Sequence, residues 1–387
     1  CDLIKNDPYG ATSMPIYQTA TFQQPGAHEF GDYDYTRSGN PTRTALQDQV
    51  ALLENFPGCK SFCFTTGMAA ISTVSRLAQQ GDEIIVNDDS YGGTYRLMSK
   101  IATRHGIKIT YVNMAGVEGL QNLRNAITSK TRLVMIESPT NPIQRICDIR
   151  NLSTICHNND HPLGTLLSID NTMMSPILCR PLELGADIVI HSATKFLSGH
   201  SDTMAGVVTV KDIPNGEKNL PDTIYFFQNA EGTALAPFDC WLVLRGLKTM
   251  SLRVKEQQRN AHEVALWLKS HSLITKVIYP GLHDHPDYDL HHSQASGAGS
   301  VVCFQTGNLA LSEHIVTVTK LFKITVSFGS VSSVISIPGH MSHASIPEQV
   351  RAARDFPEDL VRLSIGIEDP KDLIADLKVA IESFPGR

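Results

Sequence analysis

The chain lacks several features that mark whole classes of protein. Its 387 residues contain no apolar run of about 18 residues, so no membrane span is predicted. The 33 Lys and Arg residues are fewer than the 39 Asp and Glu residues, and the net charge of -6 lacks the basic excess of nucleic-acid-binding proteins. Residues 1–20 have neither the apolar core of a signal peptide nor the Arg and Ser bias of a transit peptide. These residues alone therefore predict no compartment.

The eight cysteines form no Cys-x-x-Cys pair. Scattered cysteines in a chain of this length favour buried small side chains in a reducing compartment over a disulfide framework. P-loop and G-x-G-x-x-G patterns are also absent from the sequence, which disfavours a nucleotide ligand. The cysteines stand at Cys1, Cys59, Cys63, Cys147, Cys156, Cys179, Cys240 and Cys303.

Short apolar strands alternate with small-residue loops and helices over much of the chain. This alternation predicts an α/β fold with a mostly parallel central sheet and helices on both faces. Ligands of such sheets bind beyond the carboxyl ends of the strands, where the polar groups described below fall. Strands are expected at 61–64, 83–86, 133–136, 165–169 and 187–190.

Three parts of the chain are predicted. Residues 1–43 contain many turn formers and little apolar periodicity, so this segment is not expected to fold alone. Residues 44–245 contain the strand and helix alternation. A long amphipathic helix near 249–271 then leads into a smaller α/β domain, which we assign to residues 246–387.

The stretch 187–199, DIVIHSATKFLSG, contains the most informative strand end. Its apolar strand opens into a loop where Ser192 and Thr194 place two hydroxyl groups within three residues of Lys195. A lysine in such a loop usually extends to solvent. The alternative is an amine nucleophile, a Schiff-base lysine flanked by hydroxyl donors for an anion. The choice depends on whether other strand ends supply the remaining parts of a site.

Two other strand ends carry groups suited to a cofactor. Gly67 and Met68 stand where a strand turns into a helix, and free backbone amides there bind phosphate, although glycine also serves packing in such turns. Asp170 ends an apolar strand, where a carboxylate is costly unless it is paired. It is either a helix N-cap or an ion-pair partner, or else the acid that a cofactor's cationic ring nitrogen requires.

Tyr91 and Arg362 complete the set of candidate groups. Tyr91, in SYGGT, either packs in its loop or stacks on a flat cofactor. Arg362, in DLVRLSIG, has apolar neighbours on both sides, and a guanidinium there usually binds a carboxylate of the protein or of a ligand through two hydrogen bonds. Together these groups indicate a site for pyridoxal 5'-phosphate (PLP).

Two other patterns are not favoured. The run from Ser192 to Lys195 matches the S-x-x-K of serine acylases, but residues 168–171 and 248–250 supply neither S-D-N nor K-T-G, and Ser192 follows a strand instead of opening a helix. Four histidines suggest a metal, yet their spacing fits no H-E-x-x-H or zinc-finger pattern, and a polar loop is expected there. These are His283, His285, His291 and His292.

The chain resembles the Cys/Met-metabolism family of PLP enzymes along essentially its whole length. The motifs that carry the resemblance, in the family's order, are YTRSGNPTR, FTTGMAA, DDSYGGT, ESPTNP, DNT, ADIVIHSATKFLSGHSD and LVRLSIGIED. Three further stretches look most like the plant-type cystathionine β-lyases of that family, namely NAEGTALAPFDCWLVLRGLKTM, ITVSFGSVSSVIS and MSHASIPEQVRAAR.

The resemblance implies a fold-type I PLP enzyme that assembles as a homotetramer of two active dimers. Residues 1–43 would be an arm that reaches the neighbouring subunit. Lys195 would bind the cofactor covalently and act as the base, Asp170 would keep the ring nitrogen protonated, and Tyr91 would stack on the ring. The phosphate would be bound by Gly67, Met68, Ser192 and Thr194, with Tyr35 and Arg37 of the neighbouring subunit. The substrate carboxylate would bind Arg362 and Ser327, and Asn141 would lie beside the cofactor's phenolic oxygen.

The implied reaction is β-elimination of cystathionine to homocysteine, pyruvate and ammonia, with Tyr91 or Lys195 as proton donor to the leaving thiolate. Many γ-cleaving and γ-replacing relatives carry a glutamate at the place of Ser332, which favours β-elimination here and leaves γ chemistry open. Gly93 stands where methionine γ-lyases carry a cysteine. The plant-type resemblance also implies a plastid. A scaffold without catalysis is disfavoured because the lysine, the aspartate and the arginine are all present.

Overall fold

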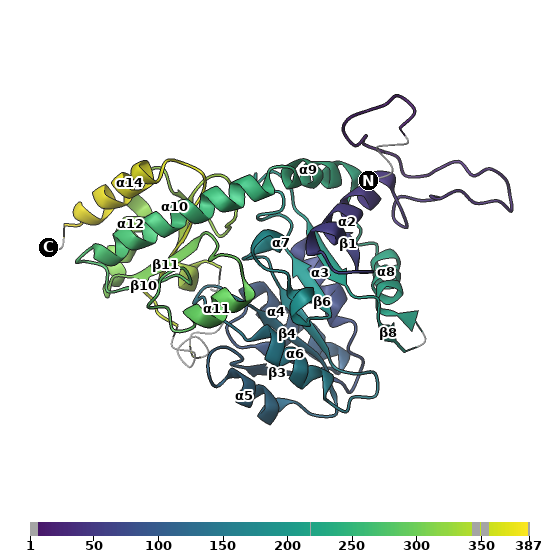
Figure 1. The fold of residues 1–387 in the computed structure, drawn as a ribbon, viewed down its shortest axis with the longest axis horizontal. Helices are drawn as coiled ribbons and strands as arrows, with labels where there is room; N and C mark the ends of the chain where they lie inside the picture. The colour runs from purple at the N-terminus through teal and green to yellow at the C-terminus, as the bar shows by residue number, and fades with distance from the viewer. Residues whose placement is uncertain (1–6, 217, 343–348, 350–355, 386–387) are drawn as a thin grey trace.

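The computed structural model describes residues 7–216, 218–342, 349 and 356–385. Of the stretch MSHASIPEQVRAAR, residues 343–348 and 350–354 lie outside this description, as does Cys1. The described chain contains a seven-stranded and a five-stranded sheet, and the helices around them give an elongated molecule (Figure 1).

The larger sheet has the strand order β1-β7-β6-β5-β4-β2-β3. Strands β2 to β6 run parallel, whereas β7 is antiparallel to both β1 and β6. The predicted mostly parallel sheet is thereby confirmed. Its strands are β1 (Lys60–Phe64), β2 (Glu83–Asn87), β3 (Lys108–Val112), β4 (Thr131–Glu137), β5 (Leu166–Asp170), β6 (Ile188–His191) and β7 (Gly206–Val210).

Helices cover both faces of this sheet, and each face has its own apolar core. Strand β2 shows why, since Ile84 and Val86 pack into one core while Ile85 packs into the other. One face carries α3 (Gly67–Ser75), α4 (Gly92–Lys100) and α8 (Leu220–Glu231). The other carries α2 (Pro41–Glu54), α5 (Gly119–Ala126), α6 (Ile149–His157), α7 (Ser175–Leu178) and α9 (Pro237–Leu247).

Helix α2 begins at Pro41, three residues before the predicted boundary at residue 44. The Asn40 side chain accepts a 3.0 Å hydrogen bond from the N–H of Thr42, and Pro41 occupies the first helical position. Both residues favour a helix start, because the cap satisfies a free N–H and proline needs none. Much of the segment 7–40 extends away from the body of the molecule (Figure 1), where Tyr9 and Phe30 are exposed, whereas Met14 is buried and its carbonyl oxygen accepts from Nε1 of Trp241 at 3.0 Å.

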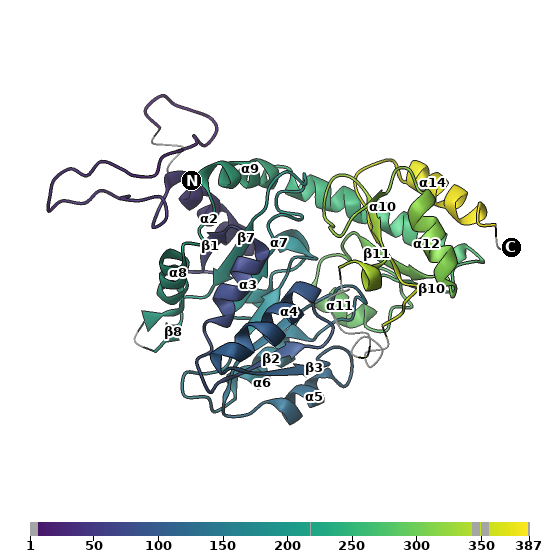
Figure 2. The same cartoon turned by 180° about the vertical axis from the view of Figure 1, so that it is seen from behind.

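The smaller sheet has the order β10-β11-β14-β13-β12 and a separate core. Helix α10 (Met250–Ser270), close to its predicted bounds, runs from α9 across this sheet (Figure 2). The predicted boundary after residue 245 falls inside α9, and the division into three parts stays a prediction.

The remaining elements are β10 (Lys276–Ile278), α11 (Tyr288–Gln294), β11 (Val301–Gln305), α12 (Leu309–Val318), β12 (Lys323–Ile324), β13 (Val334–Ser336), β14 (Val361–Ser364) and α14 (Pro370–Glu382), with the short η1 (Ala102–His105), η2 (Pro181–Leu184), η3 (Pro338–His340), β8 (Pro214–Asn215) and β9 (Lys218–Asn219).

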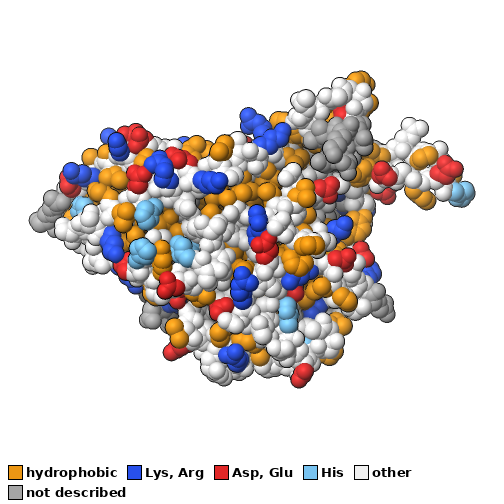
Figure 3. Space-filling view, viewed as in Figure 1, with side chains coloured by type: hydrophobic (Ala, Val, Ile, Leu, Met, Phe, Trp, Pro, Cys, Tyr) orange, Lys and Arg blue, Asp and Glu red, His pale blue; other side chains and the backbone are white. Residues whose placement is uncertain are grey.

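The fold also places the histidines and cysteines that the sequence analysis singled out. His291 and His292 lie in α11 and not in a loop, because the segment from Tyr288 forms a short helix. The described cysteines are free and buried, as expected of small core side chains. Among the helices of the described residues, none is both long and apolar enough to cross a membrane. Acidic and basic side chains are interspersed over the face shown in Figure 3.

Candidate active site

A cavity at the carboxyl ends of β4, β5 and β6 gathers most of the predicted site residues. It is closed on one side by α3 and on another by Val326 and Phe328 of the smaller sheet's loops. This position is where a parallel sheet presents ligand-binding groups. The predicted residues that line the cavity are Gly67, Met68, Tyr91, Asn141, Asp170, Ser192, Thr194 and Lys195.

Lys195 does not extend to bulk solvent. Its Nζ donates a 2.6 Å hydrogen bond to Oγ of Ser327 and lies 5.2 Å from the centre of the Phe328 ring. Burial, followed by the positive charge of Arg362, lowers the pKa of Lys195 from 10.5 to about 8. A substantial share of this amine is therefore neutral near physiological pH, as a nucleophile or base requires.

Arg362, on β14, is buried with 1% of its surface exposed. Its Nη1 donates to Oδ1 of Asn141 at 2.8 Å, and its Nη2 lies 3.3 Å from the carbonyl oxygens of Val326 and Ser327. No carboxylate of the described chain forms an ion pair with it. The guanidinium charge is thus available to an acidic ligand, which is the second of the two alternatives left open by the sequence.

The start of α3 forms an anion seat opposite Ser192. The Thr66 side chain caps the helix by accepting a 2.9 Å hydrogen bond from the N–H of Ala69. In the described part of the chain, the amides of Gly67 and Met68 at the same helix end have no hydrogen-bond partner. A Cβ at residue 67 would lie 3.0 Å from Cβ and 3.1 Å from Oγ of Ser192, so glycine allows the start of α3 to approach Ser192 closely. Backbone amides, a helix dipole and a hydroxyl therefore converge on one point.

Asp170 lies beside Glu137, because the two residues are paired across β4 and β5. Burial raises the pKa of both carboxyl groups, and the Asp170 charge raises that of Glu137 further. Hydrogen bonds from Thr172 and the charge of His191 lower the pKa of Asp170. In this pair we therefore assign the proton to Glu137 and the negative charge to Asp170.

Tyr91 stands at the first turn of α4, with 36% of its surface exposed. Its backbone N–H donates a 2.7 Å hydrogen bond to Oε1 of Glu137, which fixes the loop at the cavity edge. A Cβ at Gly93 would lie 2.4 Å from Cε1 of Tyr91 and 2.8 Å from Sδ of Met68. The absence of a side chain at position 93 thus allows the tyrosine ring and the methionine to approach each other.

Five predicted residues do not line the cavity. Ser327 and Arg362 contact its lining residues Lys195 and Asn141, and the other three lie elsewhere. Tyr35 and Arg37 are outside the cavity of their own chain, where the guanidinium carbon of Arg37 lies 5.1 Å from the Tyr35 ring centre and Nε donates to Asn229 at 3.2 Å. Ser332 lines an adjoining cleft. That cleft shares Thr194, Met204 and Phe328 with the cavity.

Sequence reasoning missed three residues of the site. Glu137 was part of a quoted motif, and its buried position beside Asp170 depends on strand pairing that no local pattern reveals. Thr172 accepts a 2.8 Å hydrogen bond from the N–H of Ser192, and so links the two strand ends. Phe328 lies below both Lys195 and Arg362. For Thr172, its place two residues after a strand-end aspartate was an available signal.

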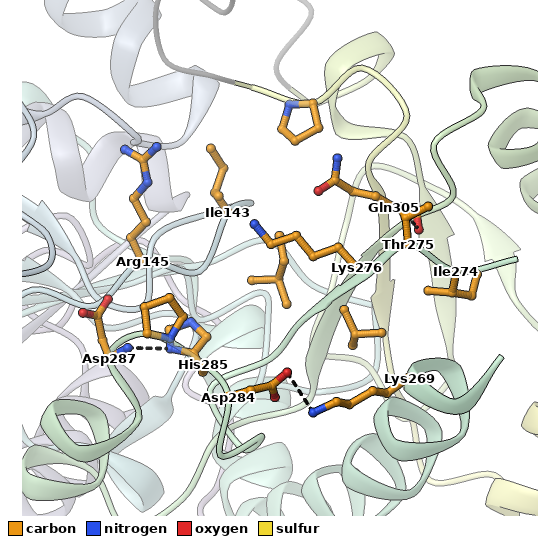
Figure 4. Close-up of a pocket in the computed structure, with 14 residues that line it drawn as sticks. Ile143, Arg145, Lys269, Ile274, Thr275, Lys276, Asp284, His285, Asp287 and Gln305 are labelled. Atoms are coloured by element: carbon orange, nitrogen blue, oxygen red, sulfur yellow. Dashed lines mark hydrogen bonds and ion pairs between the residues drawn. The ribbon is translucent and has the colours of Figure 1, made fainter. Parts of the chain in front are cut away.

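A second cleft lies between the loop at Arg145 and strand β10 (Figure 4). Its polar groups bind each other, since Nζ of Lys269 lies 2.7 Å from Oδ2 of Asp284 and the N–H of Asp287 donates to Nδ1 of His285 at 3.2 Å. It contains none of the predicted site residues. The cavity around Lys195 is therefore the candidate active site.

The cavity combines a partly neutral lysine amine, an anion seat at a helix N-terminus and a carboxylate. Enzymes that bind a phosphate-bearing ring through a lysine have this combination. The fold and the site therefore define the class of PLP-dependent enzymes. The chain belongs to the Cys/Met metabolism PLP-dependent enzyme family, whose profile matches residues 3–382. The resemblance inferred from the motifs is thereby confirmed, and the cofactor is PLP.

Relatives of known name cover nearly the whole chain. It is 56% identical to "Cystathionine beta-lyase, chloroplastic" of Arabidopsis thaliana, over 98% of this chain and 79% of that protein. It is 55% identical to the Mimosa pudica protein of the same name, over 98% and 80%. Among solved structures, cystathionine gamma-lyase from Lactobacillus plantarum complexed with L-serine superimposes with a TM-score of 0.91 at 39% identity, covering 97% of this chain and 94% of that one.

The residues present fit PLP. Gly67 and Ser192 lie close together in the cavity lining, where backbone amides of a helix N-terminus and a hydroxyl group suit a phosphate. Asp170 presents a half-buried carboxylate to the cavity, and Lys195 presents a partly neutral amine. The cavity therefore contains the three groups that this cofactor requires: a seat for its phosphate, an acid for its ring nitrogen and an amine for its aldehyde.

Proposed function

We propose that the protein is a carbon-sulfur lyase that cleaves L-cystathionine by β-elimination to homocysteine, pyruvate and ammonia. The observation that carries the proposal is the Lys195 amine, which is hydrogen-bonded to Ser327 and lies in a cavity that Asn141, the partner of Arg362, also lines. The names of the Arabidopsis and Mimosa relatives support the choice of substrate.

Lys195 is the covalent attachment point and the base. When bound, PLP supplies an electron sink for the charge left at the substrate α-carbon. The Lys195 amine, in its neutral form, would accept the α-proton of the bound substrate. The pKa near 8 provides that form without extreme pH. Lys195 and Tyr91 both line the cavity, and either can deliver a proton to the leaving thiolate.

Arg362 and Ser327 bind the substrate α-carboxylate. The planar guanidinium offers two parallel donors to a carboxylate, and Asn141 fixes its orientation through Oδ1. Since Ser327 already accepts from Lys195, the carboxylate and the base are held next to each other. This arrangement presents the α-proton to the amine.

With PLP bound, Asp170 would stabilise a positive charge on the ring nitrogen, Tyr91 would stack on the ring, and Asn141 would lie beside the phenolic oxygen; all three residues line the cavity. Thr172 supports Asp170 by donating its N–H to Oδ1 at 3.0 Å. The cofactor's phosphate would be held by the amides and hydroxyls of Gly67, Met68, Ser192 and Thr194, where a helix N-terminus favours negative charge.

Ser332 supports β-elimination over γ chemistry. The cleft that it lines adjoins the cavity, so a glutamate there would bring a second acid within reach of the distal part of a substrate. Serine offers no such carboxylate. Gly93 supports the same choice against a methionine γ-lyase, because a cysteine side chain would crowd Tyr91.

The active assembly is a homotetramer built from two active dimers. Tyr35 and Arg37, which do not line their own chain's cavity, complete the phosphate site of the neighbouring subunit. The extended course of residues 7–40 supports this arm, since its exposed aromatic side chains lack cover in a single chain (Figure 1). The names of the plant relatives support a plastid as the compartment.

Product analysis with L-cystathionine tests the proposed reaction. Pyruvate with homocysteine is the expected outcome, because β-elimination breaks the bond between sulfur and the three-carbon half. The formation of 2-oxobutyrate with cysteine would assign the chain to the γ-lyases instead. A protein that binds PLP but forms neither pair of products would be a scaffold without catalysis.

A further inference from the structure

A buried arginine of α10 holds the turn that carries Lys195. Arg253 is 5% exposed, and its Nη1 donates to the carbonyl oxygen of Phe196 at 2.9 Å. Its Nη2 donates to the carbonyl oxygens of Leu197 at 3.3 Å and Gly246 at 2.8 Å. None of the described carboxylates forms an ion pair with this guanidinium.

Such a group is expensive to bury. Burial lowers the pKa of Arg253 to about 10, which reflects the cost of removing a cation from water without an acidic partner. An apolar side chain would avoid that cost but would leave the carbonyl oxygens of Phe196 and Leu197 without a donor, whereas that of Gly246 also accepts from the N–H of Thr249 at 3.2 Å. The guanidinium therefore donates hydrogen bonds to carbonyl oxygens of the turn, which lack the backbone N–H partners that a regular helix would supply.

The turn is shaped to receive this side chain. Gly199, which ends it, has φ of +77° and donates its N–H to the carbonyl oxygen of Lys195 at 2.7 Å. A Cβ at position 199 would lie 1.9 Å from Nη1 of Arg253. Any other residue there would have to displace the arginine, so the two positions depend on each other.

One helical turn further along α10, Gln257 holds the loop that carries Ser327. It has no exposed surface, and its Nε2 donates to the carbonyl oxygen of Ser330 at 2.8 Å. In the same loop, the N–H of Val331 donates to the carbonyl oxygen of Gly199 at 2.9 Å. The two loops therefore touch, and one helix contacts both of them.

Residues at i and i+4 of a helix lie on the same face at a fixed separation. Arg253 and Gln257 use this spacing to hold one loop from the larger sheet and one from the smaller sheet. The hydrogen bond between Nζ of Lys195 and Oγ of Ser327, at 2.6 Å, spans these two loops. The length of this hydrogen bond depends on how α10 packs against the two loops.

We propose that Arg253 and Gln257 are positioning residues that set the distance between the Lys195 amine and the Ser327 hydroxyl, and with it the alignment of the base in the reaction. The inference rests on the role proposed above for Lys195. Neither residue lines the cavity, so each acts through the loop that it holds. A displacement of about 1 Å in such an alignment costs roughly 100-fold in rate.

The test compares Arg253→Gln, Arg253→Lys and Gln257→Leu with Arg259→Gln in the PLP-loaded enzyme. Arg259 lies on the exposed face of the same helix, where it binds Glu256 and Glu263, and serves as the matched control. Hydrogen exchange measured by mass spectrometry reports on each loop, and steady-state kinetics separates kcat from KM.

Arg253→Gln is expected to speed exchange in peptides that cover 196–199 and to lower kcat about 10- to 100-fold, with a much smaller change in KM. Arg253→Lys restores part of kcat, because one donor returns. Gln257→Leu, which keeps the volume and removes the donor, is expected to speed exchange in 328–331, to leave 196–199 near wild type and to lower kcat. Arg259→Gln changes neither readout.

Unchanged local exchange with wild-type kcat in both Arg253→Gln and Gln257→Leu would overturn the proposal. So would faster exchange spread evenly over the chain, because that pattern reports a purely structural role. If Arg253→Gln does not accumulate as folded protein, Gln257→Leu alone decides. Hydrogen exchange needs no substrate, so local loosening in an enzyme that forms γ-cleavage products would refute the proposed reaction and leave the positioning role intact.

Discussion

Lys195 and Ser327 are separated by 132 positions in the chain, yet Nζ of the lysine donates a 2.6 Å hydrogen bond to Oγ of the serine. Lys195 follows a strand of the larger sheet, and Ser327 lies in a loop between two strands of the smaller one. The amine therefore reaches its position only when both sheets are packed together.

The reactivity of Lys195 is expected to rise with pH around a midpoint near 8 in cofactor-free protein. Burial and the nearby cation lower the pKa of the lysine, so the protonated, unreactive form dominates below that pH and the neutral amine above it. Acylation of Lys195, followed by mass spectrometry of its peptide across a pH series, measures the midpoint. Arg362→Leu should move it upward, and a wild-type midpoint near 10.5 would contradict the prediction.

Arg362→Lys is expected to raise KM for cystathionine by roughly 10- to 100-fold, because lysine keeps the charge and loses the two-pronged hydrogen bond to a carboxylate. The same exchange at exposed Arg259 is the control and should leave KM unchanged. Steady-state kinetics of both variants provides the measurement. Equal KM values would mean that the substrate carboxylate binds elsewhere.

Asp170→Asn is expected to lower kcat at least about 100-fold, because a neutral amide cannot stabilise a positive ring nitrogen during the reaction. Glu137→Gln should lower kcat far less. We assign the proton of the pair to Glu137, and glutamine replaces a neutral acid with a neutral group of the same shape that still accepts from the N–H of Tyr91. The reverse order of the two effects would place the negative charge on Glu137.

A mixing experiment tests the arm. Arg37→Ala and Lys195→Ala should each inactivate a homomeric enzyme, the first by weakening PLP binding and the second by removing the nucleophile. If the arm completes the neighbouring site, subunits mixed in equal amounts regain roughly one quarter of wild-type activity, because half of the dimers contain one intact site. Mixtures as inactive as either parent would show that Arg37 acts within its own chain, and an Arg37→Ala homomer with wild-type activity would show that it has no role.

The sequence predicted those parts of the fold and site that have a local signal. Gly67, Asp170 and Lys195 each stand at a strand end or directly after one, so the run of apolar residues before them marks their place at one edge of the sheet. Strand β7 was not predicted, because it is antiparallel and follows the Lys195 turn without the intervening helix that the alternation led us to expect.

The remaining contacts depend on tertiary packing. Asn141 accepts a hydrogen bond from Arg362 across 221 positions, and Arg253 of α10 donates to Phe196 in the Lys195 turn across 57 positions. Neither pair has a spacing or a motif that would indicate the partner. The only available signal was a charged residue within an apolar helix face or strand. Such a residue needs a partner when it is buried, but the sequence does not identify that partner.

Reduction of the PLP-loaded enzyme with borohydride, followed by digestion and mass spectrometry, tests the central claim most directly. Borohydride fixes the bond between cofactor and lysine, so the mass of the reduced cofactor should appear on the peptide that contains Lys195 and be absent from Lys195→Ala. Attachment to a different lysine of the wild-type chain, or attachment that persists in Lys195→Ala, would contradict the account.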